Sequence, residues 1–271
     1  MCSQPNWKPS SIGFGTPNVR DPAQGLVLKN CSLISGIASM AWKNMIGVQS
    51  FPFRFTFYDV NSLTGILINS DNYLPYNNGN LMHAISDDPS KIWPVLYEKA
   101  YYQFLDNLPS LTGRPNYCNY TGWQSPVTVL TQLLGKRPVQ KNCLNANSDT
   151  VFSDIDNWCQ NWDRNVTNRT IRTPAVAWTN SSGGQYSDTT IAVQHTYSLL
   201  GVTGTKSGAN WTSKYMVLRN PYGKRKGDPA TGTGTLFTGA WCGFNLSEND
   251  GLFALKASEF VKYFSGYAWT L

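Results

Sequence analysis

The stretch Cys31-Ser-Leu-Ile-Ser-Gly-Ile-Ala-Ser-Met-Ala-Trp42 has apolar residues at positions 33, 34, 37, 38, 40 and 41. That spacing is typical of a largely buried helix, and the preceding residue, Asn30, is of a type favoured at the N-cap. Cys31 would occupy the first turn, where the helix dipole and unpaired backbone N–H groups favour a thiolate over a thiol. The sequence therefore predicts a buried helix whose first residue is a candidate nucleophile.

Partners for such a thiolate lie in the second half of the chain. A thiolate needs a proton carrier, most often histidine, and the imidazole needs a third group to fix its tautomer and ring angle. His195 lies within a strand predicted over 190–202, and Asn220 follows the next long strand, predicted over 214–219. Pro221 would hold Asn220 in an extended conformation. Because such residues occur in most chains, the spacing alone is only suggestive.

Two further polar residues are weaker candidates. Gln24 lies seven residues before Cys31 and could donate a side-chain N–H to an oxyanion. His83 is the second of only two histidines and precedes a predicted helix. We expect His83 to be structural.

The first half of the chain predicts a mixture of helices and strands. Residues 1–29 are rich in Pro, Gly and Asn and predict an irregular lead-in. The phenylalanines of 53–57 alternate with polar residues, as in a strand, and 65–69 has the pattern of its partner. An Asp-Pro pair predicts the start of a helix over 88–105, whose apolar residues recur at helical spacing.

A polar, Asn-rich segment over 137–150 is the best candidate for a boundary between two lobes. We divide the chain into 1–145, with the nucleophile helix, and 146–271, with His195 and Asn220. Thr- and Val-rich runs separated by Gly clusters predict strands in the second lobe over 175–178, 190–202, 214–219 and 235–241. A short helix is expected after Ser258. The pattern predicts an α+β fold with a helical N-terminal lobe and an antiparallel β C-terminal lobe.

Composition excludes several classes of protein. The 271 residues are 41% hydrophobic, 13% aromatic and only 14% charged, which excludes a disordered chain. No apolar run approaches the length of a membrane helix. The net charge is +6, but its densest cluster, Lys224, Arg225 and Lys226, is too short for a nucleic-acid site and predicts a solvated loop. The Thr-Gly run over 231–235 predicts a turn, not a nucleotide site.

The cysteine spacing indicates whether a metal site is expected, and the leader pattern and glycosylation motifs bear on the location of the protein. The six cysteines form no C-x-x-C pair, so no structural zinc site is expected. The segment Met1-Cys-Ser-Gln-Pro-Asn6 lacks the pattern of a leader peptide. Seven N-x-S/T sequons begin at Asn30, Asn119, Asn165, Asn168, Asn180, Asn210 and Asn245. They favour a secreted form whose leader has been removed, but they leave the location open.

Three segments resemble the protease core of the calpain family, a branch of the papain-like cysteine peptidases. Gln24-Gly25 through Asn30-Cys-Ser-Leu-Ile-Ser-Gly-Ile-Ala-Ser39 is similar to Q-G…D-C-W-L-L-A-A-I-A-S. Gln194-His-Thr-Tyr-Ser-Leu-Leu-Gly-Val202 is similar to G-H-A-Y-S-V-T-G-A, and Arg219-Asn-Pro-Tyr-Gly223 to R-N-P-W-G. Two further stretches agree in order: Ile92-Trp-Pro-Val-Leu-Tyr-Glu-Lys-Ala-Tyr101 with F-W-S-A-L-L-E-K-A-Y, and Asp250-Gly-Leu-Phe253 with D-G-E-F.

The resemblance implies a papain-like fold of two lobes with a peptide substrate between them. It implies that Cys31 is the nucleophile, His195 the acid/base, Asn220 its orienting partner and Gln24 an oxyanion donor. The aromatic Tyr222 stands where the family has Trp, and could line the substrate cleft. The family resemblance also implies a cytoplasmic location, against the secreted form that the sequons favour.

The chain departs from the family pattern near the site. Ser32 replaces the Trp after the nucleophile, Lys29-Asn30 replaces Gly-Asp, and Gln24 lies one residue further from the cysteine. Calpain cores bind calcium through acidic residues shortly after N-P-W-G, where this chain has its basic cluster. Calcium prefers anionic oxygen ligands, so the family's acidic ligand pattern is lost here and calcium dependence is left open, whereas the triad itself requires no cofactor.

Three functions remain compatible with the sequence. The first is a cysteine endopeptidase that hydrolyses protein or peptide substrates through Cys31, His195 and Asn220. The second is a catalytically silent protein that keeps the fold for binding or scaffolding, as the altered surroundings of Cys31 suggest. The third is acyl transfer to an amine on the same residues. Oligomeric state and cleavage preference do not follow from the sequence.

Overall fold

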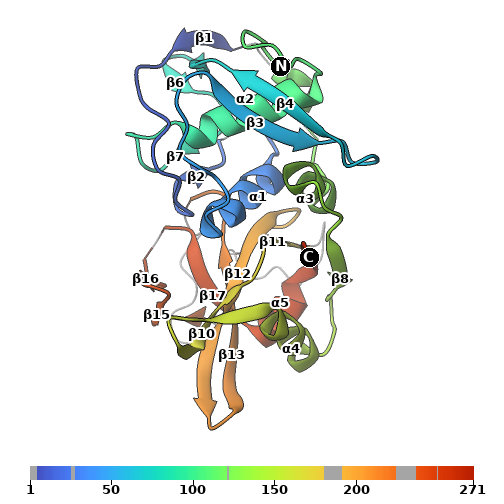
Figure 1. Cartoon of the computed structure of the whole chain (residues 1–271). Coiled ribbons are helices and arrows are strands. Elements are labelled where there is room, and N and C mark those ends of the chain that lie inside the picture. The colour runs from blue at the N-terminus through green and yellow to red at the C-terminus, as the bar shows by residue number, and fades with distance from the viewer. Residues whose placement is uncertain (1–4, 26–27, 121, 180–190, 224–235, 249) are drawn as a thin grey trace. The chain divides into compact units, whose positions relative to one another are not determined.

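Two compact units make up the chain, Met1–Pro138 and Val139–Leu271. Figure 1 shows the computed structural model, which describes residues 5–25, 28–120, 122–179, 191–223, 236–248 and 250–271. Both units combine helices with antiparallel strands, so the fold class is α+β, as predicted. Several predicted features lie wholly or partly outside the described residues: the basic cluster 224–226, the turn 231–235, the sequon at Asn180, and the first residues of the strands predicted over 190–202 and 235–241.

The first unit holds three α-helices among its described residues. They are α1 (Cys31–Trp42), α2 (Trp93–Leu105) and α3 (Pro126–Leu134), with a 3-10 turn at Tyr117–Tyr120. The helix predicted from Cys31 to Trp42 is therefore confirmed. It is buried from Cys31 to Ala41, because its Gly, Ala and Ser residues let neighbouring chains approach closely.

Short antiparallel strands surround these helices. Their pairings are β1 (Asn6–Pro9) and β6 (Asn80–Leu81) on either side of β5 (Tyr73–Asn77), β2 (Pro22–Ala23) with β7 (Ile85–Ser86), and β3 (Phe53–Tyr58) with β4 (Gly65–Ser70). The β3–β4 pair was predicted. The lead-in 1–29 was expected to be irregular, but two short strands form there because partners distant in sequence supply their hydrogen bonds.

The core of the first unit is built between β3 and α2. Phe53, Phe55 and Phe57 are all buried, as their alternation requires. The rings of Phe55 and Phe57 meet Tyr97 of α2 edge to face, with centroids 5.1 and 5.6 Å apart. Aromatic pairs in this geometry are stabilised beyond the area that they bury.

The second unit contains a nine-stranded antiparallel sheet. Its main order is β14-β17-β13-β12-β11-β18-β8, with β10 paired to β12 and β9 to β10. The strands are β8 (Val139–Asn142), β9 (Cys159–Trp162), β10 (Asn165–Ile171), β11 (Ala175–Thr179), β12 (Thr196–Ser207), β13 (Asn210–Arg219), β14 (Leu236–Phe237), β17 (Leu252–Lys256) and β18 (Phe264–Trp269). A separate hairpin joins β15 (Ala240–Trp241) and β16 (Phe244–Asn245). Helices α4 (Ser148–Trp158) and α5 (Ala257–Tyr263) accompany the sheet (Figure 1).

The β12–β13 hairpin is the longest pairing of this sheet. Its register runs from Ser207 opposite Asn210 at the turn to Ser198 opposite Arg219 at the open end. His195 immediately precedes β12 and Asn220 immediately follows β13. Both residues therefore lie at the open end of the same hairpin. The prediction that His195 lies inside a strand was wrong by one residue.

Two further predictions require correction. Helix α2 begins at Trp93, not at the Asp88-Pro89 pair, because the Asp88 carboxylate accepts hydrogen bonds from the backbone and hydroxyl of Ser90 and closes a local turn instead. The expectation of an essentially β second lobe missed α4. That helix has an N-cap signal, since Asn147 Oδ1 accepts from the backbone N–H groups of Asp149 and Thr150.

Among the described residues, no helix combines the length and apolarity needed to cross a membrane. Cys118 is disulfide-bonded. Cys31, Cys143, Cys159 and Cys242 are not part of disulfides, and all four are buried.

The cap of α4 can be tested by substitution at Asn147. We expect Asn147→Ala to lower the free energy of unfolding by about 1 kcal/mol, because two backbone N–H groups lose their acceptor. Asn147→Asp keeps an acceptor oxygen and should retain wild-type stability. Urea unfolding followed by circular dichroism measures both variants, and equal stability of Asn147→Ala and Asn147→Asp would contradict the assigned cap.

Candidate active site

Cys31 is held by its position at the start of a buried helix. It is the first residue of α1 and only 2% of its surface is exposed. The next residue, Ser32, donates its hydroxyl to the backbone oxygen of Gln124 at 2.7 Å. Packing along α1 and this bond fix the first turn, whose N–H groups and dipole favour an anion. The thiol therefore lies where a thiolate is stabilised.

Asn30 occupies the predicted N-cap position but does not cap the helix with its side chain. Its backbone oxygen accepts from Ile34 at 3.1 Å, whereas no side-chain cap hydrogen bond forms. Instead Asn30 Nδ2 donates to Oε1 of Glu98, a fully buried residue of α2. The expected side-chain cap is therefore wrong: the amide is turned so that Nδ2 donates to the buried carboxyl, and Oδ1 accepts no hydrogen bond from the helix N–H groups.

Gln24 follows β2 in the segment that leads to the nucleophile helix. Its Nε2 donates to the backbone oxygen of Leu28 at 2.7 Å, and its side chain is partly buried. The β2–β7 pairing, in which Ala23 lies opposite Ile85, fixes where this segment begins. One of the two amide hydrogens of Gln24 is therefore engaged within its own loop.

In the second unit the structure brings His195 and Asn220 together. His195 Nε2 lies 3.0 Å from Asn220 Oδ1, and both residues are buried. The backbone of His195 is fixed by Thr179, whose Oγ1 accepts its N–H at 3.0 Å and whose own N–H donates to the His195 oxygen at 2.9 Å. The imidazole is thus fixed through its backbone and through one ring nitrogen.

The hydrogen bonds define the tautomer of His195. The backbone N–H of Tyr222 donates to Asn220 Oδ1 at 3.0 Å. Because an N–H needs an oxygen as its acceptor, this contact identifies the amide oxygen of Asn220. Nε2 of His195 faces the same oxygen and must carry a hydrogen. In the neutral ring, Nδ1 is then the basic nitrogen.

Tyr222 stacks on the imidazole. The ring centroids of His195 and Tyr222 are 4.5 Å apart with an interplanar angle of 20°. Tyr197 meets the imidazole at its edge, with centroids 5.1 Å apart and an angle of 84°. The two tyrosines therefore restrict the rotation of the ring about its side-chain bonds.

The second histidine lies in a different environment. His83 belongs to the first unit, is fully buried, and lies against Tyr117 with ring centroids 4.0 Å apart and the rings tilted by 38°. Neither of its ring nitrogens has a hydrogen-bond partner among the described residues. Burial lowers the pKa of His83 to about 4, so the ring is neutral near pH 7.

The comparison with protein families now decides the class. The family model of calpain family cysteine proteases matches residues 7–268. The chain belongs to the calpain family of cysteine proteases. Comparison with curated proteins finds no significant match. By family the chain is a thiol protease and therefore of the hydrolase class. The matched range, 7–268, includes all five motifs quoted above.

One residue near the candidate nucleophile of this calpain-family chain was missed by the sequence reasoning. Glu98 lies in the segment Trp93–Gln103, which is buried on all sides of α2, and no local pattern distinguishes a buried glutamate there from an exposed one. Its Oε2 accepts from the backbone N–H of Ala84 at 2.9 Å. The only available signal was position, because the family pattern F-W-S-A-L-L-E-K-A-Y also carries a glutamate there.

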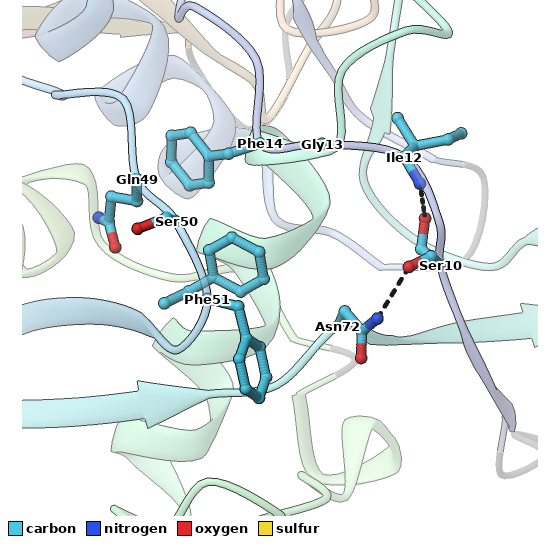
Figure 2. A pocket seen from close by; sticks show the side chains of 9 residues that line it. Ser10, Ile12, Gly13, Phe14, Gln49, Ser50, Phe51 and Asn72 are labelled. Carbon is cyan, nitrogen blue, oxygen red and sulfur yellow. Dashed lines mark hydrogen bonds between the residues drawn. The ribbon is translucent and has the colours of Figure 1, made fainter.

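A cavity of about 400 Å³ lies in the first unit away from these residues (Figure 2). The phenyl rings of Phe14, Phe51 and Phe53 line it together with polar side chains. Asn72 Nδ2 donates to the Ser10 oxygen at its edge, at 2.8 Å. None of the predicted site residues lines this cavity, so it does not contribute to the site described above.

The burial of His83 predicts how stability depends on pH. The folded state holds this ring neutral down to pH about 4, whereas the unfolded chain binds the proton near pH 6.5. The unfolded state therefore binds more protons between these values, and the free energy of unfolding falls by up to roughly 3 kcal/mol as the pH drops from 6.5 to 4.

His83→Phe keeps an aromatic ring against Tyr117 and removes the group that titrates. We expect this variant to lose less stability than the wild type between pH 7 and pH 4 in urea unfolding followed by tryptophan fluorescence. An identical loss in both proteins would show that His83 is protonated in the folded state.

Proposed function

We propose that the chain is a cysteine endopeptidase with the two-lobe arrangement of papain-like enzymes. The two compact units are then the two lobes, Cys31 is the nucleophile of the first, and His195 and Asn220 are the acid/base and its orienting partner in the second. Membership of the calpain family supports this proposal. The single observation that carries it is the 3.0 Å contact between His195 Nε2 and Asn220 Oδ1, since it presents Nδ1 as the proton-exchanging nitrogen.

The first half of the reaction forms an acyl-enzyme. The Cys31 thiolate attacks the carbonyl carbon of a peptide bond, and the oxyanion accepts hydrogen bonds from backbone N–H groups at the start of α1. His195 gives its Nδ1 proton to the leaving nitrogen as the C–N bond breaks, which leaves a thioester and a free amine. Gln24 serves the oxyanion with the amide hydrogen that the Leu28 bond does not use.

The second half hydrolyses the thioester. A water molecule gives a proton to Nδ1 of His195 and its oxygen attacks the thioester carbon. The C–S bond breaks, the acid leaves, and the imidazolium–thiolate pair is restored. Throughout, Asn220 keeps the Nε2 hydrogen in place, and stacking on Tyr222 holds the ring plane. The stacked position also makes Tyr222 the proposed aromatic residue of the substrate cleft.

The proposed reaction uses no calcium. Within the part of the chain that the structure describes, no group of three or more His, Cys, Asp or Glu side chains could hold a metal ion. The positions shortly after Asn220 carry Lys224, Arg225 and Lys226 in the sequence, and cationic side chains do not supply the oxygen ligands that calcium needs. The proposed substrates are proteins or peptides, as for the family.

A silent scaffold is the second candidate, favoured by one observation. Ser32 stands in place of the family's Trp beside the nucleophile, and its hydroxyl is directed to the Gln124 oxygen. A scaffold would need neither a reactive thiol nor an oriented imidazole. The reactivity of Cys31 therefore distinguishes the two functions.

Labelling with an epoxysuccinyl inhibitor tests the nucleophile. Intact-mass analysis should detect one modified cysteine in the wild type, with calcium and with a chelator alike, and none in Cys31→Ala or His195→Ala. Cys31→Ala should also abolish casein hydrolysis while keeping the circular dichroism spectrum. Cys143→Ala is the matched control, since burial raises the pKa of that thiol to about 12 and keeps it unreactive. Retained turnover in Cys31→Ala would refute the assignment.

Asn220 can be tested independently of the nucleophile. Asn220→Ala removes the acceptor of the Nε2 hydrogen, so neither the tautomer nor the ring orientation of His195 is fixed by that bond any longer. We expect kcat/KM for casein to fall about 10²-fold. Asn210→Ala, at the turn of the same hairpin, should keep wild-type kcat/KM. An unchanged value in Asn220→Ala would show that His195 is oriented by other contacts.

A further inference from the structure

A single buried carboxyl bonds both Asn30, which directly precedes the proposed nucleophile, and the backbone at Ala84. Glu98 is fully buried within α2. Its Oε1 accepts from Asn30 Nδ2, and its Oε2 accepts from the Ala84 backbone N–H at 2.9 Å. Both oxygens therefore act on chain segments outside the helix that carries them. Burying a carboxyl is costly unless its hydrogen bonds are satisfied, and here each of the two oxygens accepts one.

The bond to Asn30 acts on the first turn of α1. Asn30 is 1% exposed and directly precedes Cys31. Its side chain does not cap the helix, so its orientation is set by Glu98. Because Asn30 and Cys31 share a peptide bond, the carboxyl of Glu98 fixes the backbone at which the nucleophile begins.

The bond to Ala84 acts on the segment of Gln24. A Cβ on Gly25 would lie 1.8 Å from the backbone oxygen of His83, so residue 25 packs directly on the 83–84 backbone. The same backbone donates to Glu98 through Ala84. Glu98 thus holds the surface on which the segment 24–25 rests.

We propose that Glu98 is a positioning residue of the peptidase, which fixes Cys31 through Asn30 and the Gln24 segment through Ala84. The proposal rests on the proposed function. Under this proposal, catalysis depends on a residue outside the triad, because a hydrogen-bonded carboxyl from α2 sets the position of the thiolate at the start of α1.

The surroundings of Glu98 keep it mostly uncharged. Burial raises its pKa to about 8, although the bonds from Ala84 and Asn30 oppose that rise. The groups that face it, His83, Tyr102 and Tyr117, are neutral near pH 7. Burial is the main cause in each case: it lowers the pKa of His83 and raises the pKa of both tyrosines. Cys31 and Glu98 each add to the rise at Tyr102, and Arg114 opposes the rise at Tyr117. A protonated Glu98 places no negative charge beside the thiolate.

Three variants of the full chain test the proposal. Glu98→Met has similar volume but no acceptor, and should slow both casein hydrolysis and iodoacetamide alkylation of Cys31 about 10- to 100-fold. Asn30→Ala removes only the link to α1 and should also slow alkylation, and the double variant should be no slower than Glu98→Met alone, because that variant already lacks the same bond. Glu98→Gln can accept from Ala84 and donate to a rotated Asn30 amide, so it should recover most of the activity.

A pH profile separates positioning from folding. The wild-type alkylation rate of Cys31 should respond to the ionisation of Glu98 near pH 8, and Glu98→Gln should lack that response. Tyr101→Phe, which loses a buried bond of α2 to Gln132, is the matched control and should keep wild-type alkylation. Asn30→Ala decides the matter if Glu98→Met does not fold.

The outcomes distinguish this proposal from the function on which it rests. Casein hydrolysis by the wild type together with unchanged alkylation in Glu98→Met and Asn30→Ala would overturn the positioning role alone. Alkylation that depends on Glu98 in a protein that never hydrolyses casein would overturn the peptidase function alone. Losses that only follow the folded fraction, with no rescue by Glu98→Gln, would also overturn the positioning role.

Discussion

The antiparallel register of β12 and β13 is the constraint on which the histidine half of the site depends. Ser198 pairs with Arg219 at the open end of the hairpin, so the residues just beyond each strand meet there. His195 and Asn220 are separated by 25 positions in the chain, yet the ladder brings their side chains to hydrogen-bonding distance without any further loop. A one-residue slip would turn one of them to the opposite face of the sheet. The hairpin is also paired on both edges, with β11 beside β12 and β17 beside β13, and these ladders oppose such a slip.

The cysteine half depends on a different kind of constraint. A strand ladder fixes position through many repeated bonds, whereas the start of a helix has unpaired groups and tends to fray. Helix α1 has no side-chain cap, so the order of its first turn must come from outside the helix. Ser32 bound to the Gln124 oxygen and Asn30 bound to Glu98 supply it. The candidate residues of each unit are therefore held in place for a different reason.

The sequence predicted the parts of the fold that local patterns determine. The apolar spacing of 33–41 gave the nucleophile helix, and the alternation over 53–57 gave β3. The end of β13 at Arg219 also follows from a local cause, because Pro221 cannot continue a central strand. Helix α4 was missed because only Val151, Phe152 and Ile155 of its residues are buried, and so few apolar positions resemble a polar linker.

Contacts between distant segments were beyond the reach of the sequence. Glu98 bonds a residue 68 positions away, and the neighbouring Lys99 is buried against Asp71, 28 positions away. Two adjacent charged residues on a helix normally predict a solvated face, and here both are buried. The candidate site residues Cys31, His195 and Asn220 could be selected only through the family motifs, because spacing does not show which of two histidines meets which amide.

The departure of this chain from its family at position 30 has a physical explanation in the same contact. The family pattern places Asp before the nucleophile and Glu in the L-E-K segment, so two carboxyls would face each other at a buried position. Like charges cannot both ionise there, and one carboxyl would have to keep a proton in order to donate. In this chain the Asn30 amide supplies that hydrogen to Glu98 at every pH. The Nδ2 atom of Asn30 is also the atom to which a glycan would attach in the Asn30-Cys31-Ser32 sequon. Asn30 is only 1% exposed, so a glycan there could not coexist with the folded first turn of α1. The contact with Glu98 therefore accounts for an amide at position 30, and the sequon follows only from the serine that replaces the family's Trp.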